Sequence, residues 1–323
     1  MARLRGPHLR TPLTLLESDR DALLRSQPEV LAAGEDARYL VTRAGAAAVT
    51  ESEDGTVGLL LEREDPRAGT HQPLVFLGRR DGLRVLAVEI PEPSPELDDP
   101  GRDLRDLRHV ADQLVPADAD LALAAVAMGS WHRSMRHCTS CGQLLEVEQA
   151  GWVLRCREDG SEHFPRTDPA VIMGVRDDQD RLLLARNAHF RGRFHSVLAG
   201  FVEPGETLEG AVVREVAEEV GVAVTAVEYA GSQPWPFPRS LMLGYRVWAD
   251  GSPAMVLQED EIAEARWFTR DELRAEVEAG TVELPGGSSL GRALIDDWLG
   301  TDADPSQGAG TLGGDDRPAR PRP

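Results

Sequence analysis

The chain has 323 residues, of which 41% are hydrophobic, and its 35 Lys and Arg residues face 55 Asp and Glu residues. This length suffices for two domains, because a single hydrophobic core stops growing at about 250–300 residues. The formal net charge of −20 argues against broad, sequence-independent binding to nucleic acid or to an anionic membrane, since both need a basic surface. An anionic small-molecule substrate stays compatible with this charge, provided that metal ions supply positive charge locally.

The first half of the chain reads as a β-rich domain that ends in a helix. The opening segment, MARLRGPHLRTPLTLLE, is basic but lacks a sustained apolar core, so we expect no signal peptide. No apolar run reaches the ~18–20 residues of a membrane span. Strands and tight turns are predicted over 38–90, where Asp-Gly pairs at 54–55 and 81–82 are turn signals. A Pro- and Asp-rich connection over 91–99 leads to a helical pattern over 104–135.

The three cysteines lie within one short segment. Cys138 and Cys141 form a CxxC knuckle, and Cys156 follows fifteen residues later. An odd number of closely spaced cysteines is typical of a metal knuckle in a reducing compartment, so we expect structural zinc and a cytoplasmic protein. A second complete knuckle would need a cysteine at position 159, which is occupied by Asp159. Asp159 is the favoured fourth ligand, while His163, or a chain that has lost its zinc, remains an alternative.

A further domain opens with a hairpin predicted from PAVIMGVRD and DRLLLARN. Beyond Trp298 the tail GTDADPSQGAGTLGGDDRPARPRP has too few apolar residues to pack, and we predict that it is disordered. The predicted domains are a β-rich N-terminal domain over 1–130, a zinc ribbon over 131–166, a larger domain over 167–300 and a disordered tail over 301–323.

A strongly acidic segment, GFVEPGETLEGAVVREVAEEVGV, occupies residues 200–222. A helix is predicted over 207–221, since glycine is common just past a helix end. At 100° per residue, Glu215, Glu218 and Glu219 share one face. The apolar residues expected on the opposite face, packed on the core, are Val213, Val216, Ala217 and Val220. Carboxylates this close can stay ionised together around a hard divalent cation, so Mg²⁺ or Mn²⁺ is favoured over a solvated acidic surface.

The spacing of this segment resembles the signature of the Nudix hydrolases. The matching positions are Gly200, Glu206, Arg214–Glu215–Val216, Glu218–Glu219 and Gly221–Val222. The resemblance implies a mixed α/β fold, a Nudix α/β/α sandwich over 167–300, preceded by the zinc ribbon and the β-rich domain. It also implies that Glu215 and Glu219 bind the catalytic metal with Glu218 beside them, and that loss of Glu219 stops catalysis. Arg214 and Glu206 would pair to fix the loop.

A second motif, SQPWPFPRSLM at 232–242, begins ten residues after the acidic segment ends. Its three closely spaced prolines restrict the conformations of the loop. The motif resembles the SQPWPFPxS signature of the NADH pyrophosphatase subgroup of Nudix hydrolases. That resemblance implies hydrolysis of the pyrophosphate of NADH or NAD⁺ to nicotinamide mononucleotide and AMP, removal of NAD caps from RNA 5′ ends, and a homodimer. The net charge of −20 predicts that RNA contact is confined to the terminus.

The same resemblance implies further site residues. Phe164 and Phe201 would stack on a ring of the bound dinucleotide, unless either is a core residue. The other substrate-binding positions are Ile172, Gln233, Ser240 and Met242. A further metal-binding glutamate falls on Glu261, in a run of three acids over 259–261. There a shift of one or two positions, or a solvated acidic turn, is the alternative.

Two other functions remain open. A Nudix hydrolase of ADP-ribose or of dinucleoside polyphosphates would share the acidic segment, although SQPWPFPRS argues against it. A non-catalytic NAD-sensing or RNA-binding protein would be free to lose Glu215, Glu218 and Glu219, and all three are present.

Overall fold

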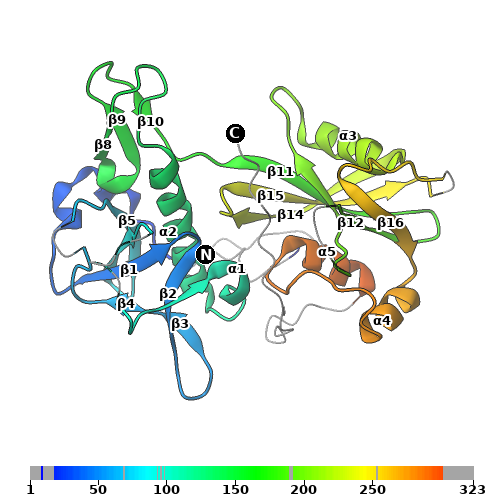
Figure 1. Cartoon of the computed structure of the whole chain (residues 1–323), viewed down its shortest axis with the longest axis horizontal. Helices are drawn as coiled ribbons and strands as arrows, with labels where there is room; N and C mark the ends of the chain where they lie inside the picture. Colours follow the sequence, from blue (N-terminus) through cyan, green and yellow to red (C-terminus); the bar gives the residue numbers. More distant parts are fainter. Residues whose placement is uncertain are drawn as a thin grey trace. The chain divides into compact units, whose positions relative to one another are not determined.

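The computed structural model describes residue 9 and residues 18–67, 70–92, 94, 97, 99–188, 192–251 and 254–300. The chain divides into two compact units (Figure 1). The first comprises residues 1–14, 168–233 and 241–323, and the second comprises residues 15–167 and 234–240. The tail predicted to be disordered, over 301–323, lies outside the described residues, as does the opening segment apart from Leu9.

Within its described ranges, the second unit is built on a seven-stranded sheet and two α-helices. The strands are β1 (Ala37–Arg43), β2 (Ala46–Glu51), β3 (Val57–Leu59), β4 (Leu61–Glu62), β5 (Leu74–Arg80), β6 (Leu83–Glu89) and β7 (Asp103–Asp106). Their order is β3-β2-β1-β6-β5, with β1 and β6 parallel, β4 paired with β1 and β7 paired with β2. The predicted strands and turns are confirmed, since Gly55 and Gly82 adopt φ values of 83° and 79° that glycine reaches without strain.

The helices of this unit are α1 (Leu107–Val110) and α2 (Pro116–Ser134). The helix predicted over 104–135 therefore begins later than expected, because residues 103–106 pair with β2 as strand β7. Short 3₁₀ helices are formed by Ala22–Ser26, Pro28–Leu31 and Gln149–Gly151.

A small antiparallel sheet carries the cysteine segment. Its strands are β8 (Leu145–Glu148), β9 (Val153–Cys156) and β10 (Glu162–His163), in the order β10-β9-β8. Trp152 anchors it to the larger sheet, because its indole N–H donates to the Phe76 carbonyl over 2.7 Å and its ring lies 3.6 Å from the Arg25 guanidinium carbon.

The described residues of the first unit form one six-stranded sheet and three helices. Its strands are β11 (Asp168–Arg176), β12 (Leu182–Asn187), β13 (Leu198–Phe201), β14 (Val224–Trp235), β15 (Ser240–Ala249) and β16 (Ile262–Phe268). Its helices are α3 (Leu208–Val220), α4 (Arg270–Glu278) and α5 (Leu290–Leu299). The strand order is β14-β15-β11-β12-β16, with β13 paired to β11. The predicted hairpin is confirmed as the antiparallel pair β11 and β12.

Helices cover both faces of this sheet (Figure 1). Alternate residues of a strand point to opposite faces, so Val171 and Met173 pack with Val212 and Val216 of α3. Ile172, between them, packs on the other side with the core that includes α4 and α5. The expected α/β/α layering is confirmed. Of the helices within the described ranges, none combines the length and apolar character that a membrane span requires.

Candidate metal-dependent active site

Helix α3 begins and ends where the sequence predicts. The Thr207 hydroxyl accepts a hydrogen bond from the Gly210 N–H over 3.1 Å and caps the N-terminus. Gly221 ends the helix at φ 68°, and its N–H donates to the Ala217 carbonyl. These caps fix the register of the acidic residues along the helix.

The expected division of α3 into two faces was partly wrong. Val213 is 44% exposed and Ala217 is also exposed, although both were expected to pack on the core. Glu215 and Glu219 are only 8% and 5% exposed, while Glu218 lies at the surface. Angular spacing places residues around a helix axis, but it does not say which arc a neighbouring sheet covers. Here the covered arc includes two of the three carboxylates.

Gly200 on β13 makes room for the buried Glu215. A β-carbon added at Gly200 would lie 1.9 Å from the carboxyl carbon of Glu215, far inside contact distance. Any other residue at this position would displace the carboxylate. Gly200 was part of the sequence signature, but the spacing of the signature did not show that a glycine is needed there to leave room for Glu215.

Arg214 connects the loop before α3 to the carboxylates. Its Nε and Nη2 donate to the two carboxylate oxygens of Glu206, both over 2.9 Å, which confirms the predicted pair. Nη1 donates to Glu215 over 3.0 Å and to Glu218 over 2.9 Å, and Nη2 also donates to the Phe201 carbonyl. The hydrogen bond from Arg214 lowers the pKa of Glu206. This arginine is therefore fully engaged in holding the site together.

Glu219 is the carboxylate left without a partner. Burial, followed by the charges of Glu215, Glu261 and Glu218, raises the pKa of Glu219 to about 8. Its Oε2 is buried and accepts no hydrogen bond from the described residues. Burial also raises the pKa of Glu215, against the opposing effect of Arg214. Buried, mutually repelling oxygen donors of this kind fit a hard divalent cation.

Glu261 faces this cluster from the segment just before β16. It raises the pKa of both Glu215 and Glu219, an effect that its neighbours Glu259 and Asp260 do not share. Its carbonyl accepts from the Ala188 N–H over 2.7 Å, which ties the segment to the end of β12. Glu261 is therefore the acid of this run whose charge acts on both buried carboxylates of α3, and its role as a metal ligand remains a prediction.

The two predicted stacking residues lie at the surface. Phe201 is 59% exposed at the end of β13, and Phe164 is 54% exposed just after β10. This exposure rules out the alternative that either ring belongs to a core. They lie in different units, and both side chains are accessible to a ligand.

The other predicted substrate positions are more enclosed. Gln233 is 1% exposed: its Nε2 donates to the Ser288 carbonyl over 2.6 Å, and its Oε1 accepts from the Leu290 N–H over 2.8 Å. These bonds fix the start of α5. Ile172 is 8% exposed in the core shared with α5, and Met242 packs against that core in part. Ser240 begins β15 and is partly exposed. A substrate contact for these residues remains a prediction.

The cysteine segment forms a compact group of four potential metal ligands. The donor atoms of Cys138, Cys141, Cys156 and Asp159 all lie within 4.8 Å of one another. Cys138 Sγ is 3.3 Å from Asp159 Oδ2, and the sulfurs of Cys141 and Cys156 are 3.4 Å apart. Tetrahedral zinc with Zn–S bonds near 2.3 Å places its ligands about 3.8 Å apart, so this donor set fits zinc.

The surroundings favour the charged forms of Cys138 and Asp159, whereas the neighbouring thiols Cys156 and Cys138 raise the pKa of Cys141 to about 12. The Ser161 hydroxyl, with the backbone around Cys141, lowers the pKa of Cys138 to about 6. The same hydroxyl lowers the pKa of Asp159. His163 contacts Ser161 and lies outside the group of four, so the described residues favour Asp159 over His163 as the fourth ligand.

Comparisons with known proteins agree with this arrangement. A NUDIX domain matches residues 166–284, and an NADH pyrophosphatase-like rudimentary NUDIX domain matches residues 29–131. The NAD-capped RNA hydrolase NudC of Mycobacterium tuberculosis is 38% identical over 306 residues, covering 88% of this chain and 94% of that protein. The NAD-capped RNA hydrolase NudC of Stutzerimonas stutzeri is 40% identical over 223 residues, covering 69% and 76%. A solved Nudix hydrolase of Nitrosomonas europaea matches with a TM-score of 0.37 at 20% identity, covering 46% of this chain and 97% of that chain. The sequence similarity thus extends over both units and well beyond the acidic segment.

Proposed function

This chain belongs to the Nudix hydrolase family, and we propose that it hydrolyses the pyrophosphate bond of NADH or NAD⁺ and removes NAD caps from RNA 5′ ends. The products from the free dinucleotide are nicotinamide mononucleotide, reduced when NADH is cleaved, and AMP. The observation that carries the proposal is the buried pair Glu215 and Glu219, in which Glu219 Oε2 has no partner among the described residues. The names of the relatives and the NADH pyrophosphatase-like match support the choice of substrate.

The proposed metal ligands are the carboxylates of Glu215, Glu218, Glu219 and Glu261, with Mg²⁺ or Mn²⁺ as the cation. When bound, such a cation neutralises the diphosphate and lowers the pKa of the attacking water. Arg214 contributes by position, because its bonds to Glu206, Glu215 and Glu218 hold three carboxylates in one arrangement. One water is consumed: its oxygen joins one phosphorus, and the bond from that phosphorus to the bridging oxygen breaks.

Recognition of the dinucleotide is proposed to use the exposed rings of Phe201 and Phe164. Stacking of a base on an aromatic side chain contributes about 1–3 kcal/mol in single-strand binders. The exposure of both rings leaves this area available to a ligand.

The second proposed metal is a structural zinc held by Cys138, Cys141, Cys156 and Asp159. Substituting Cys138→Ser should abolish zinc binding and lower the melting temperature, because the strands β8 to β10 have little core of their own. Metal analysis of the parent protein should return about one zinc per chain. A parent protein that binds no zinc, and gains no stability when zinc is added, would contradict this site.

Two further properties are proposed from the resemblance and from composition. We propose that the protein is a homodimer, which analytical ultracentrifugation would test against a monomer. We also propose a reducing, cytoplasmic compartment, because all three cysteines fall in the zinc site.

Product analysis tests the proposed activity directly. Purified protein with Mg²⁺ or Mn²⁺ is offered NADH, NAD⁺, ADP-ribose and NAD-capped RNA, and the products are separated by chromatography. Release of AMP and nicotinamide mononucleotide from the dinucleotides, absent with the Glu219→Gln variant, is the expected result. Preference for ADP-ribose would favour the alternative Nudix substrate. No turnover of any compound would favour a non-catalytic binding protein.

A further inference from the structure

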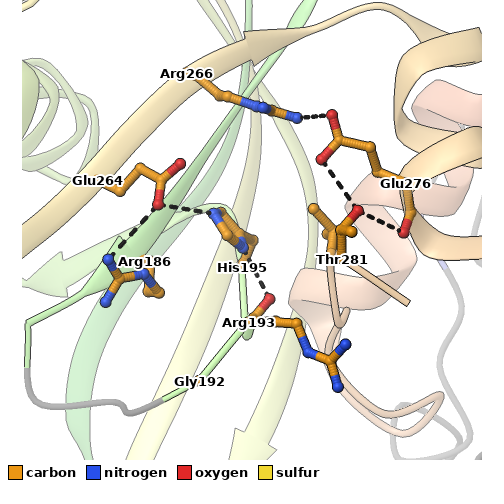
Figure 2. A pocket seen from close by; sticks show the side chains of 9 residues that line it. Arg186, Gly192, Arg193, His195, Glu264, Arg266, Glu276 and Thr281 are labelled. Carbon is orange, nitrogen blue, oxygen red and sulfur yellow. Dashed lines mark hydrogen bonds and ion pairs between the residues drawn. The ribbon is translucent and has the colours of Figure 1, made fainter. Parts of the chain in front are cut away.

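A separate pocket of about 180 Å³ lies on the other face of the six-stranded sheet (Figure 2). It is lined by Arg186, Arg193, His195, Glu264, Arg266, Glu276, Thr281 and neighbouring residues. Glu264 and Arg266 point away from Ala265 and Trp267, which pack on the α3 side. The pocket is smaller than the ~300–1,000 Å³ typical of drug-sized ligands, so it suits a fragment and not a whole dinucleotide.

His195 presents an unsatisfied nitrogen to this pocket. Its side chain is buried, and Nδ1 lies 2.9 Å from the Arg193 carbonyl, which can only accept a hydrogen bond. Nδ1 therefore carries the proton in the neutral ring, and Nε2 is an acceptor. Nε2 has no hydrogen-bond partner among the described residues, and a carboxylate oxygen of Glu264 lies 3.9 Å away. Two acceptors face each other, and a ligand hydroxyl would supply the missing donor (Figure 2).

The charges of the pocket favour a singly charged anion. Arg266 forms an ion pair with Glu276, and Arg186 lies 3.6 Å from Glu264. Arg193 donates to the carbonyl of Gly280 and has no carboxylate in ion-pair contact within the described ranges, so its charge is uncompensated. With a neutral imidazole the lining carries one net positive charge. This matches one phosphodiester better than a phosphate monoester, which carries about −1.5 to −2 at neutral pH.

We propose that this pocket binds one ribose-phosphate unit of an RNA chain, with the phosphodiester on Arg193 and the 2′-hydroxyl between His195 and Glu264. The proposal rests on the proposed removal of NAD caps. Glu264 on β16 lies three residues after Glu261, which precedes the strand, and three residues span at most about 10 Å, so an RNA whose capped end is at the carboxylates can reach Glu264 around this edge strand. The 2′-hydroxyl is the group that separates RNA from DNA, which makes the proposal specific.

Two variants test the pocket, each by removing a different group. His195→Asn keeps a side-chain N–H for the Arg193 carbonyl and removes Nε2, whereas Arg193→Ala removes the uncompensated charge at the surface. Arg274→Ala, an exposed arginine of α4 outside the pocket, is the matched control. The readouts are kcat/KM for NADH, for a short NAD-capped RNA and for the same RNA with a 2′-deoxy nucleotide after the cap.

Both pocket variants should lower kcat/KM for NAD-capped RNA roughly 5- to 10-fold, as expected for the loss of one ordinary hydrogen bond, and leave kcat/KM for NADH unchanged. His195→Asn should also lose the parent preference for the ribonucleotide. Equal losses on both substrates, no loss on either, or a parent enzyme that cleaves NADH but not the capped RNA would overturn the proposal.

Binding separates this proposal from the proposed activity. A fluorescent, uncapped oligoribonucleotide is titrated by anisotropy against a matched oligodeoxyribonucleotide. Weaker RNA binding in both variants supports the pocket even if no substrate is hydrolysed. Unchanged RNA binding, or equal binding of RNA and DNA by the parent, overturns it.

Discussion

The substitution Glu219→Gln should stabilise the protein at neutral pH when Mg²⁺ and Mn²⁺ are absent. The pKa of Glu219 is raised from 4.5 to about 8, so between these values the folded state holds a proton that the unfolded state has lost. Because the folded state binds more protons, the free energy of unfolding falls as pH rises through this window. The slope reaches about 1.4 kcal/mol per pH unit, which is of the order of 4 kcal/mol between about pH 5 and pH 8. At pH values below this window Glu219 causes no loss of stability, and above the window the loss is constant.

Urea unfolding of the parent and the variant at several pH values measures this term. Glutamine keeps the shape of the side chain and cannot titrate, so the two proteins should be similarly stable near pH 5. The variant should become more stable by several kcal/mol near pH 8. Glu218→Gln is the control, because Glu218 is exposed and its charge is the smallest of those that raise the pKa of Glu219, so its loss should change the pH dependence only slightly. Parallel curves for the parent and Glu219→Gln would refute the reasoning.

Adding Mg²⁺ should reverse the order of stability. A cation that binds only the folded parent stabilises it by RT ln(1 + [L]/Kd), and the variant should gain much less. The same variant should lose most of its turnover. A metal response that is equal in the two proteins would place the cation elsewhere.

Three other substitutions test separate parts of the site. Gly200→Ala should lower kcat by roughly a hundredfold, because the added carbon displaces Glu215. The control Gly286→Ala adds a carbon into open space and should leave kcat unchanged. Equal kcat values for the two variants would contradict the packing of Glu215 against Gly200. Asp159→Cys should raise zinc affinity in a chelator competition, since it completes a four-thiolate site, and weaker binding would place residue 159 outside the coordination sphere. Phe201→Ala should lower kcat/KM for NADH by roughly 5- to 150-fold with little change in melting temperature, whereas a loss of ~3–5 kcal/mol in stability with KM retained would show a structural role.

The helix of the acidic segment was predictable because its boundaries are set locally. Thr207 and Gly221 cap α3 through bonds to residues three or four positions away, and such short-range signals are visible in a sequence. The strands of the second unit were predictable for the same reason, since Gly55 and Gly82 mark their turns.

Burial on α3 was not predictable, because it depends on which arc of the helix the sheet covers, and the spacing of residues along the helix does not determine that arc. The absence of a side chain at Gly200 allows the Glu215 carboxylate to sit against β13, and this contact moves two glutamates onto the covered arc. Gln233 is a similar case: its amide bonds to residues more than fifty positions away. The pocket around His195 draws on β12, β16, α4 and the loop before β13, and no spacing in the sequence joins them.

An acidic protein that acts on polyanions must concentrate positive charge at particular points. The chain contains no lysine, so all its 35 basic side chains are arginines, which stay charged and hold planar anions. On α3 the single arginine, Arg214, is engaged with Glu206, Glu215 and Glu218 and leaves no charge for a diphosphate, which is why a metal is required there. In the pocket, one uncompensated guanidinium, Arg193, remains. Each phosphate contact to single-stranded nucleic acid contributes a slope of about −0.7 when log affinity is plotted against log salt concentration. The slope for capped RNA should therefore be more negative than the slope for NADH by roughly 0.7. A difference in slope equal to several phosphate contacts would contradict this prediction, because it would require a larger basic surface than the described residues of this pocket provide.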